Sequence, residues 1–282
     1  MTGPIVPSGT GLDSFLRSQM AGWPGEAACG ICSAPGTVAA VGPLERAFAW
    51  ASVTKLLVSL AALVATEEGT LALEQPAGPP GSTVAHLLSH SSGLPFEGKT
   101  AIAPPGRRRV YSNTGMEVLA AHLESSTGVA FAHYVQEAVL VPLGMSATRL
   151  SGSPAHGASG PLTDLLSLSR ELLSPRLVSK ETWDRATSVA FPGLAGVVPG
   201  FGRYDPCDWG LGPELRSGKS PHWTGSLNSP ATYGHFGQSG SLVWADPAAG
   251  IALCSLSSAG FGPWAKQAWP ALADSVLAVA GT

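Results

Sequence analysis

A serine and a lysine three residues apart are the first residues of this chain whose spacing could do chemistry. Ser52 and Lys55 precede the apolar segment 56–65, and together they predict a buried helix over about 52–68. Residues i and i+3 share one helix face, so the hydroxyl and the amine can meet. A serine needs a base to become a nucleophile, and burial lowers the pKa of an amine toward the range in which it accepts that proton. The pair predicts nucleophilic catalysis by Ser52, and the start of a helix favours the negative charge that develops during attack.

The segment Tyr111-Ser112-Asn113 is a second candidate element. Beside Ser52 and Lys55, its phenol would shuttle protons, with a pKa lowered by the neighbouring ammonium. The amide of Asn113 would bind a substrate carbonyl and the Lys55 amine. A tyrosine that only fills the core is the alternative interpretation.

The third element is His235-Phe236-Gly237-Gln238, in a predicted strand. Because glycine has no Cβ, Gly237 would let a substrate lie close to the strand. The backbone N–H of Gln238 would then complete an oxyanion hole with that of Ser52. A hydrogen-bonded structural histidine is the alternative interpretation of His235.

Composition limits the classes of function. The 282 residues are 44% hydrophobic and 12% charged, with a net charge of −3. Such a chain can bury a large core, and it lacks the charge expected of a disordered protein or a partner of nucleic acid or anionic membranes. The basic cluster Arg107-Arg108-Arg109 is too short to bind nucleic acid, and we expect a solvated loop with one or two ion pairs.

No targeting or membrane-spanning segment is visible. Residues 1–11 have neither a basic start nor an apolar run, and the segment 56–65 is about half as long as a membrane span. We therefore predict a cytoplasmic protein with no membrane partner.

Metal and cofactor sites are not predicted. Cys29 and Cys32 lie three apart in a predicted strand, so they point to opposite faces, and all four cysteines are expected to be reduced thiols. His86 and His90 are four apart on a short predicted helix but have no third ligand in sequence, so a zinc site is not expected.

The order of elements predicts an α+β fold. Helices are expected over 12–20, 52–68, 83–90, 116–127, 131–139, 162–173 and 263–280, and strands over 26–33, 36–41, 209–211, 231–237, 241–245 and 251–257. Strands at both ends imply an antiparallel sheet built from both termini and flanked by helices, with an inserted, mainly helical lobe. We assign 1–55 and 200–282 to the sheet lobe and 56–199 to the helical lobe, with the Gly- and Pro-rich segment 192–206 at the boundary.

Taken together, the motifs resemble the serine β-lactamase and penicillin-binding superfamily. S-x-x-K stands at 52–55, Y-x-N at 111–113 and H-x-G at 235–237. The stretch L-L-S-H-S-S-G-L-P at 87–95 and P-L-G-M at 142–145 are similar to the branch that holds class C β-lactamases, D-alanyl-D-alanine carboxypeptidases and family VIII esterases. The resemblance covers roughly residues 26–282 and implies a β-lactamase/transpeptidase-like fold.

The resemblance also implies the roles of the site residues. It implies an acyl-enzyme mechanism with Ser52 as nucleophile, Lys55 and Tyr111 as the base system, and the N–H groups of Ser52 and Gln238 as oxyanion hole. Asn113, His235, Phe236 and Gly237 would line the substrate site.

One departure from the family bears on the substrate. Relatives that bind a substrate carboxylate usually have K-T-G or H-T-G as third motif, and here Phe236 replaces the threonine and donates no hydrogen bond. The chain is also shorter than typical members, so we expect a more open site. We therefore expect a serine hydrolase of small carboxylic esters or amides, without a cofactor. A true β-lactamase or D-amino-acid peptidase, and a non-catalytic binding protein that kept the fold, are the alternatives.

Overall fold

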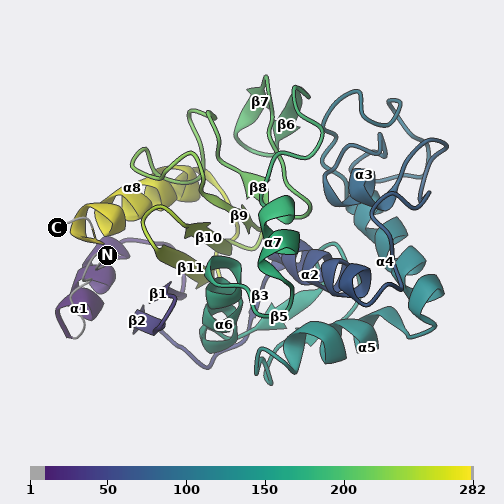
Figure 1. Cartoon of the computed structure of the whole chain (residues 1–282). Helices are drawn as coiled ribbons and strands as arrows, with labels where there is room; N and C mark the ends of the chain where they lie inside the picture. The colour runs from purple at the N-terminus through teal and green to yellow at the C-terminus, as the bar shows by residue number, and fades with distance from the viewer. Residues whose placement is uncertain (1–9, 281–282) are drawn as a thin grey trace.

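A six-stranded antiparallel sheet drawn from both ends of the chain lies at the centre of the molecule (Figure 1). The computed structural model describes residues 10–280, so the expectation for residues 1–11 falls almost wholly outside it. In spatial order the strands are β2 (Gly36–Val41), β1 (Ala27–Ser33), β11 (Ile251–Ser257), β10 (Leu242–Asp246), β9 (Tyr233–Phe236) and β8 (Glu214–Leu215). Every neighbouring pair is antiparallel, which confirms the predicted α+β fold with a sheet built from both termini.

Helices cover both faces of this sheet. On one face, α1 (Thr10–Gln19) and α8 (Pro263–Ala280) pack against it through a cluster that includes Leu16, Cys29 and Trp269. On the other face, α6 (Leu162–Leu173) packs against β1, β10 and β11. Cys29 lies in the first layer and Cys32 in the second, as the strand period predicts, and both thiols are free.

A helical layer stands beside the sheet and is organised around α2 (Thr54–Glu67), most of whose side chains are buried. The helices α4 (Asn113–Thr127) and α5 (Phe131–Val135) contact it, and α5 continues as a π-helical segment over Gln136–Leu140. The shorter helices are α3 (Val84–Leu88) and α7 (Lys180–Ala186). The division into a sheet lobe and a helical lobe stays a prediction, and we note that α6, inside the predicted helical lobe, packs on the sheet.

Two smaller sheets border the site. One is three-stranded, with β5 (Ala158–Gly160) between β3 (Phe48–Ala49) and β4 (Arg149–Leu150). The other is the hairpin of β6 (Gly196–Val198) and β7 (Gly202–Tyr204), which lies inside the segment predicted to be a lobe boundary. No helix among residues 10–280 is long and apolar enough to span a membrane.

The predicted strand over 209–211 is wrong. Trp209 makes only an isolated bridge to Glu214, and the edge strand is the two-residue β8 instead. The intervening Gly212 has φ of +122°, a conformation that ends an extended run, and Pro213 cannot donate a strand hydrogen bond. Helix α7 was missed because it is short and mostly polar; its start is capped by Ser179, whose hydroxyl accepts from the N–H of Thr182.

Candidate active site

Ser52 lies in a tight turn between β3 and α2. The turn is a short 3₁₀ segment over Ala51–Val53, and Ala51 has φ of +43°, a left-handed conformation uncommon for alanine. Trp50 anchors the turn, since its N–H donates to the Ala158 carbonyl at 2.9 Å and its indole donates to the Gly160 carbonyl at 3.2 Å. The predicted helix over 52–68 therefore begins as 3₁₀, and Ser52 is held half-buried at a cavity of about 320 Å³.

Lys55 lies one turn further on and is fully buried. Its Nζ lies 3.2 Å from the Oγ of Ser52, so the two side chains meet on the helix face as their spacing predicts. The same Nζ donates to Asn113 Oδ1 at 2.8 Å and to the Ala155 carbonyl at 2.9 Å. These contacts fix the amine from three directions.

The protonation of Lys55 follows from its surroundings. Burial lowers the pKa of the amine to about 7, and the carboxylate of Glu117 opposes that fall. The two carbonyl oxygens, of Asn113 and Ala155, can only accept hydrogen bonds, so they use two N–H groups of the amine. When the amine is neutral, its lone pair is left for the hydroxyl of Ser52.

Tyr111 lies against the same amine, whose Nζ is 4.7 Å from the centre of the phenol ring. Burial raises the pKa of Tyr111, and an interaction with the Ser52 hydroxyl opposes that rise. The prediction of a lowered pKa for this phenol is therefore wrong, because the loss of hydration on burial dominates. The phenol keeps its proton at neutral pH.

His235 on β9 faces Tyr111. Its Nδ1 lies 2.7 Å from the carbonyl oxygen of Phe236, which can only accept, so Nδ1 carries the proton and Nε2 is an acceptor. Nε2 lies 3.5 Å from the Tyr111 hydroxyl, at the limit of a hydrogen bond. Burial and the charge of Lys55 lower the pKa of His235 to about 4. The imidazole is therefore neutral at neutral pH and offers no charge to an anionic substrate.

The turn after β9 brings Gly237 against the Ser52 turn. A Cβ on Gly237 would lie 2.4 Å from the Trp50 carbonyl oxygen and 3.0 Å from the Ala51 Cβ. Glycine is thus required for the contact of β9 with the nucleophile turn, whereas the sequence suggested close approach of a substrate. Gln238 follows and lines the same cavity as Ser52. In the described part of the chain, the N–H groups of Ser52 and Gln238 are donors in no backbone hydrogen bond.

Phe236, the residue after His235 on β9, also lines the cavity and is 8% exposed. Its ring packs in an aromatic cluster with Phe201, Trp223, Phe261 and Trp269 at centroid distances of 5.2–5.7 Å. The wall of the cavity is therefore apolar at Phe236.

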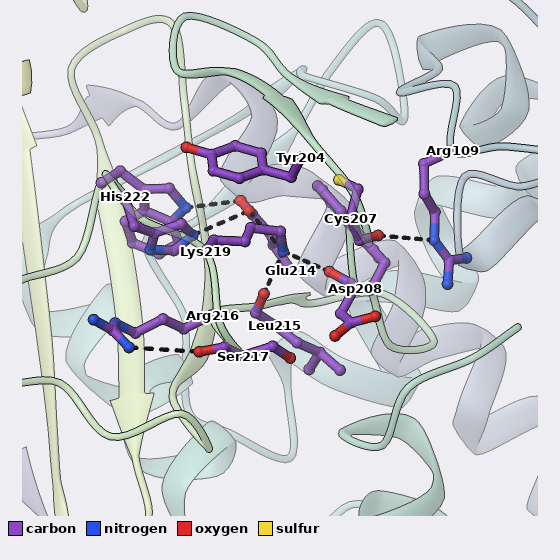
Figure 2. Close-up of polar contacts among 12 residues, drawn as sticks. Arg109, Tyr204, Cys207, Asp208, Glu214, Leu215, Arg216, Ser217, Lys219 and His222 are labelled. Atoms are coloured by element: carbon purple, nitrogen blue, oxygen red, sulfur yellow. Dashed lines mark hydrogen bonds and ion pairs between the residues drawn. The ribbon is translucent and has the colours of Figure 1, made fainter. Parts of the chain in front are cut away.

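A buried ionic network is centred on Glu214, which Figure 2 shows beside Lys219 and His222. The Oε1 of Glu214 is 3.2 Å from Lys219 Nζ and 3.1 Å from His222 Nε2, and its Oε2 accepts from the Trp223 indole at 2.7 Å. Burial alone would raise the pKa of Glu214, but these partners lower it to about 2. His222 accepts from the backbone N–H of Thr224 at Nδ1, so its Nε2 holds the proton and donates to Glu214. Glu214 also lines the cavity, and no sequence motif indicated this network.

Comparison with known proteins identifies the family. The Beta-lactamase family matches residues 45–278, a range that includes all the candidate site residues. The chain belongs to the β-lactamase family.

Two solved structures share the fold over most of the chain, and one further relative matches part of its sequence. A crystal structure of a β-lactamase from Mycobacterium bovis is 49% identical, with a TM-score of 0.93, over 95% of this chain and 100% of that one. The hydrolase EstCE1, described as having promiscuous acyltransferase activity, is 17% identical with a TM-score of 0.77, over 95% of this chain and 100% of that one. Penicillin-binding protein 4* of Bacillus subtilis (strain 168) is 29% identical over 136 residues, which are 36% of this chain and 30% of that protein.

Three contributors to this β-lactamase-family site were not predicted as such. His90 has φ of +55°, and its ring centre lies 4.6 Å from that of Tyr111. Trp209 is buried, and its ring lines the cavity with its centre 5.9 Å from that of Tyr111. The Ala155 carbonyl is a backbone group, which carries no sequence signal. His90 belongs to the L-L-S-H-S-S-G-L-P stretch, and that motif could have pointed to it.

Metal ligands are not gathered anywhere in the chain between residues 10 and 280: no group of three or more His, Cys, Asp or Glu side chains there could hold an ion.

Proposed function

We propose that this protein is a serine hydrolase that cleaves small carboxylic esters or amides through an acyl-Ser52 intermediate. The observation that carries the proposal is the position of Lys55: a fully buried amine with a pKa of about 7 and two of its hydrogens bound to carbonyl oxygens lies 3.2 Å from the Ser52 hydroxyl. An amine held in this way accepts the serine proton at neutral pH.

In the first step, the Oγ of Ser52 attacks the substrate carbonyl carbon and its proton passes to Lys55. The negative charge moves to the carbonyl oxygen, where the N–H groups of Ser52 and Gln238 stabilise it. The C–O or C–N bond to the leaving group then breaks. Tyr111 gives its proton to the leaving atom and takes the one held by Lys55, so the phenol is never left charged.

In the second step, water attacks the acyl carbon, loses a proton to Lys55 and releases the carboxylic acid. Ser52 recovers its proton, and the enzyme returns to its starting state. Asn113 would orient both Lys55 and the substrate carbonyl, and His235, Phe236 and Gly237 would line the site.

Covalent labelling of Ser52 tests this proposal. Intact-mass spectrometry after exposure to a fluorophosphonate and to nitrophenyl butyrate should reveal one adduct or acyl group on the parent and none on Ser52→Ala. Turnover of the ester by Ser52→Ala within tenfold of the parent would exclude the acyl-enzyme mechanism. A folded parent that neither hydrolyses esters nor forms an adduct would favour a non-catalytic binding protein.

Hydrolysis of β-lactams is the second candidate, because a relative 49% identical over nearly the whole chain is described as a β-lactamase. The apolar Phe236 argues for esters, since a substrate carboxylate that leaves water needs a hydrogen-bond donor. The ratio of kcat/KM for nitrocefin and nitrophenyl butyrate decides between them. Location in the cytoplasm stays a prediction.

A further inference from the structure

A second hollow of about 710 Å³ lies beside the Ser52 cavity. Phe96, Tyr111 and Pro199 line both, so the two spaces adjoin at these side chains. Its walls are the loop that follows α3 and the β6–β7 hairpin, which lie side by side near the top of the molecule (Figure 1). A bridge between Arg109 and Gly196 ties the two walls together. We call this hollow the leaving-group groove, because we expect it to hold the alcohol half of an ester substrate.

The surface of the groove is apolar. Phe96, Ile102 and Val197 line it and are 49%, 55% and 53% exposed. Exposed apolar side chains usually occur singly on a protein surface. Three of them gathered in one hollow beside an active site are therefore typical of a ligand-binding groove.

Arginines surround this apolar surface. Arg107, Arg108 and Arg203 line the groove. Arg203 lies 3.6 Å from Asp205 in an exposed ion pair. Arg107 and Arg108 belong to none of the ion pairs found among residues 10–280, and Arg108 only donates to the Ile102 carbonyl at 3.2 Å.

Arg109 adds a positive charge beneath the groove. It is buried, and its guanidinium donates only to backbone carbonyls, those of Ser89, Ala190, Phe191 and Cys207. Burial lowers its pKa to about 10, so it stays charged at neutral pH. Arg107 and Arg108 are exposed in a loop as predicted, but Arg109 is buried, and none of the three forms an ion pair among residues 10–280. Four arginines line the groove; among residues 10–280, Asp205 is the one carboxylate in an ion pair with any of them, and Asp208 acts on the buried Arg109. This excess of positive charge favours an anionic occupant.

The groove lies on the side of Tyr111, and this decides which half of a substrate enters it. A general acid must contact the atom that it protonates, and in the proposed mechanism Tyr111 protonates the leaving oxygen. Ser52 and Gln238, which would hold the carbonyl oxygen, line the cavity but not the groove. The alcohol half of an ester therefore points into the groove.

We propose that the substrate is an ester whose leaving alcohol has an apolar body that ends in an anionic group, a carboxylate or a phosphate. The body would pack on Phe96, Ile102 and Val197, and the anion would bind Arg107, Arg108 or Arg203. This inference rests on the proposed function, because it needs acyl transfer to Ser52.

Two matched pairs of esters test it. The first pair varies the alcohol: the butyrate esters of 6-hydroxyhexanoate and of 6-hydroxyhexanamide. The second pair varies the acyl half: monobutyl adipate and its neutral amide. We expect kcat/KM for the anionic ester to exceed that of the neutral one by at least fivefold in the first pair and not in the second. The preference should shrink in 0.5 M NaCl, because salt screens exposed charges.

Arginine variants locate the effect. Arg107→Gln, Arg108→Gln and Arg203→Gln should each reduce the ratio of the two alcohol-pair esters about two- to fivefold, the scale of an exposed ion pair, and the triple variant should bring it near one. The ratio cancels any loss of activity common to both esters. Arg185→Gln is the control. Arg185 lies on α7 outside the groove, where it pairs with Glu74, so this variant should leave the ratio unchanged.

The outcomes separate the two proposals. If all esters are turned over but the anionic and neutral esters of the first pair have nearly equal kcat/KM, the groove assignment alone is overturned. The same holds if the triple variant keeps the preference of the parent. A preference for the anionic acyl half overturns it as well. Absence of turnover together with absence of fluorophosphonate labelling at Ser52 overturns the proposed function and this inference with it.

Discussion

The amine of Lys55 lies 3.2 Å from the hydroxyl of Ser52 at the buried start of α2. Burial lowers the pKa of that amine to about 7, so its neutral form is well populated at physiological pH. The base of the proposed mechanism is therefore prepared by its position in the core, and no neighbouring histidine is needed to activate the serine.

The pH dependence of acylation follows from this relationship. A depressed lysine pKa means that the active, neutral form is gained as pH rises through about 7. We expect kcat/KM for a nitrophenyl ester to increase with pH along a limb with its midpoint near 7. His235 should contribute no limb near 6.5, because its pKa is about 4. A midpoint above 9 would contradict the role of Lys55.

Glu117 offers a control for that limb. Its carboxylate raises the pKa of Lys55 against the effect of burial. Glu117→Gln should therefore move the midpoint to lower pH without removing it. Glu137→Gln, at another exposed position, should leave the midpoint in place.

Lys55 and Tyr111 should behave as one proton relay. Lys55→Ala and Tyr111→Phe are each expected to lower kcat by at least about 10²-fold, the scale of general acid–base catalysis. If the two groups pass a single proton, the double variant will be little worse than either single one. Losses that multiply in full would show that the residues act independently. Rates from a stopped-flow burst on the four proteins provide the measurement.

The fold was predictable where the local pattern and the tertiary environment agree. The helices over 162–173 and 263–280 match α6 and α8, because their apolar periods coincide with the faces that they bury. The strand over 251–257 matches β11, a central strand whose seven residues are all buried. The strand over 209–211 failed because Gly212 and Pro213 end the extended run before it can pair.

The residues that meet in the candidate site could be predicted from the sequence, but their pKa values could not. Ser52 and Lys55 meet because a helix dictates it, and Asn113 reaches the lysine as expected. The pKa directions of Tyr111 and His235 depend on burial, which comes from distant segments such as His90 and Trp209 and cannot be inferred from spacing. The Glu214 network joins a residue of β8 to Lys219 and His222 in the segment that follows, and no sequence motif predicts that contact.

Glu214 should govern acid stability. Its pKa is about 2 in the folded protein, against 4.5 as its ordinary value, so its contribution is present above about pH 4.5 and is lost as pH falls toward 2. Glu214→Gln would leave Lys219 charged and unpaired in the core, at a cost of about 3–5 kcal/mol at pH 7. Urea unfolding at pH 7 and pH 3 should therefore show a smaller difference between variant and parent at pH 3. An equal difference at both pH values would contradict this role, and Glu137→Gln serves as the exposed control.

Phe236 should set the preference between esters and β-lactams. Its ring forms part of an apolar cavity wall, and a threonine there would donate a hydrogen bond to a substrate carboxylate. A hydrogen bond to a charged group contributes about 1.5–3 kcal/mol, so Phe236→Thr should raise the ratio of nitrocefin to nitrophenyl butyrate kcat/KM by roughly ten- to a hundredfold.

The same change removes a ring packed against Trp223, Phe261 and Trp269, and truncation of a buried phenylalanine to alanine costs about 3–5 kcal/mol. Phe236→Leu is the matched control, because it opens space beside those rings without adding a donor. An increase in the nitrocefin ratio that Phe236→Leu shares would assign the effect to space in the cavity and not to the hydroxyl. If the parent already prefers nitrocefin, or if the ratio does not move in Phe236→Thr, the wall formed by Phe236 does not determine the substrate and the ester assignment is wrong.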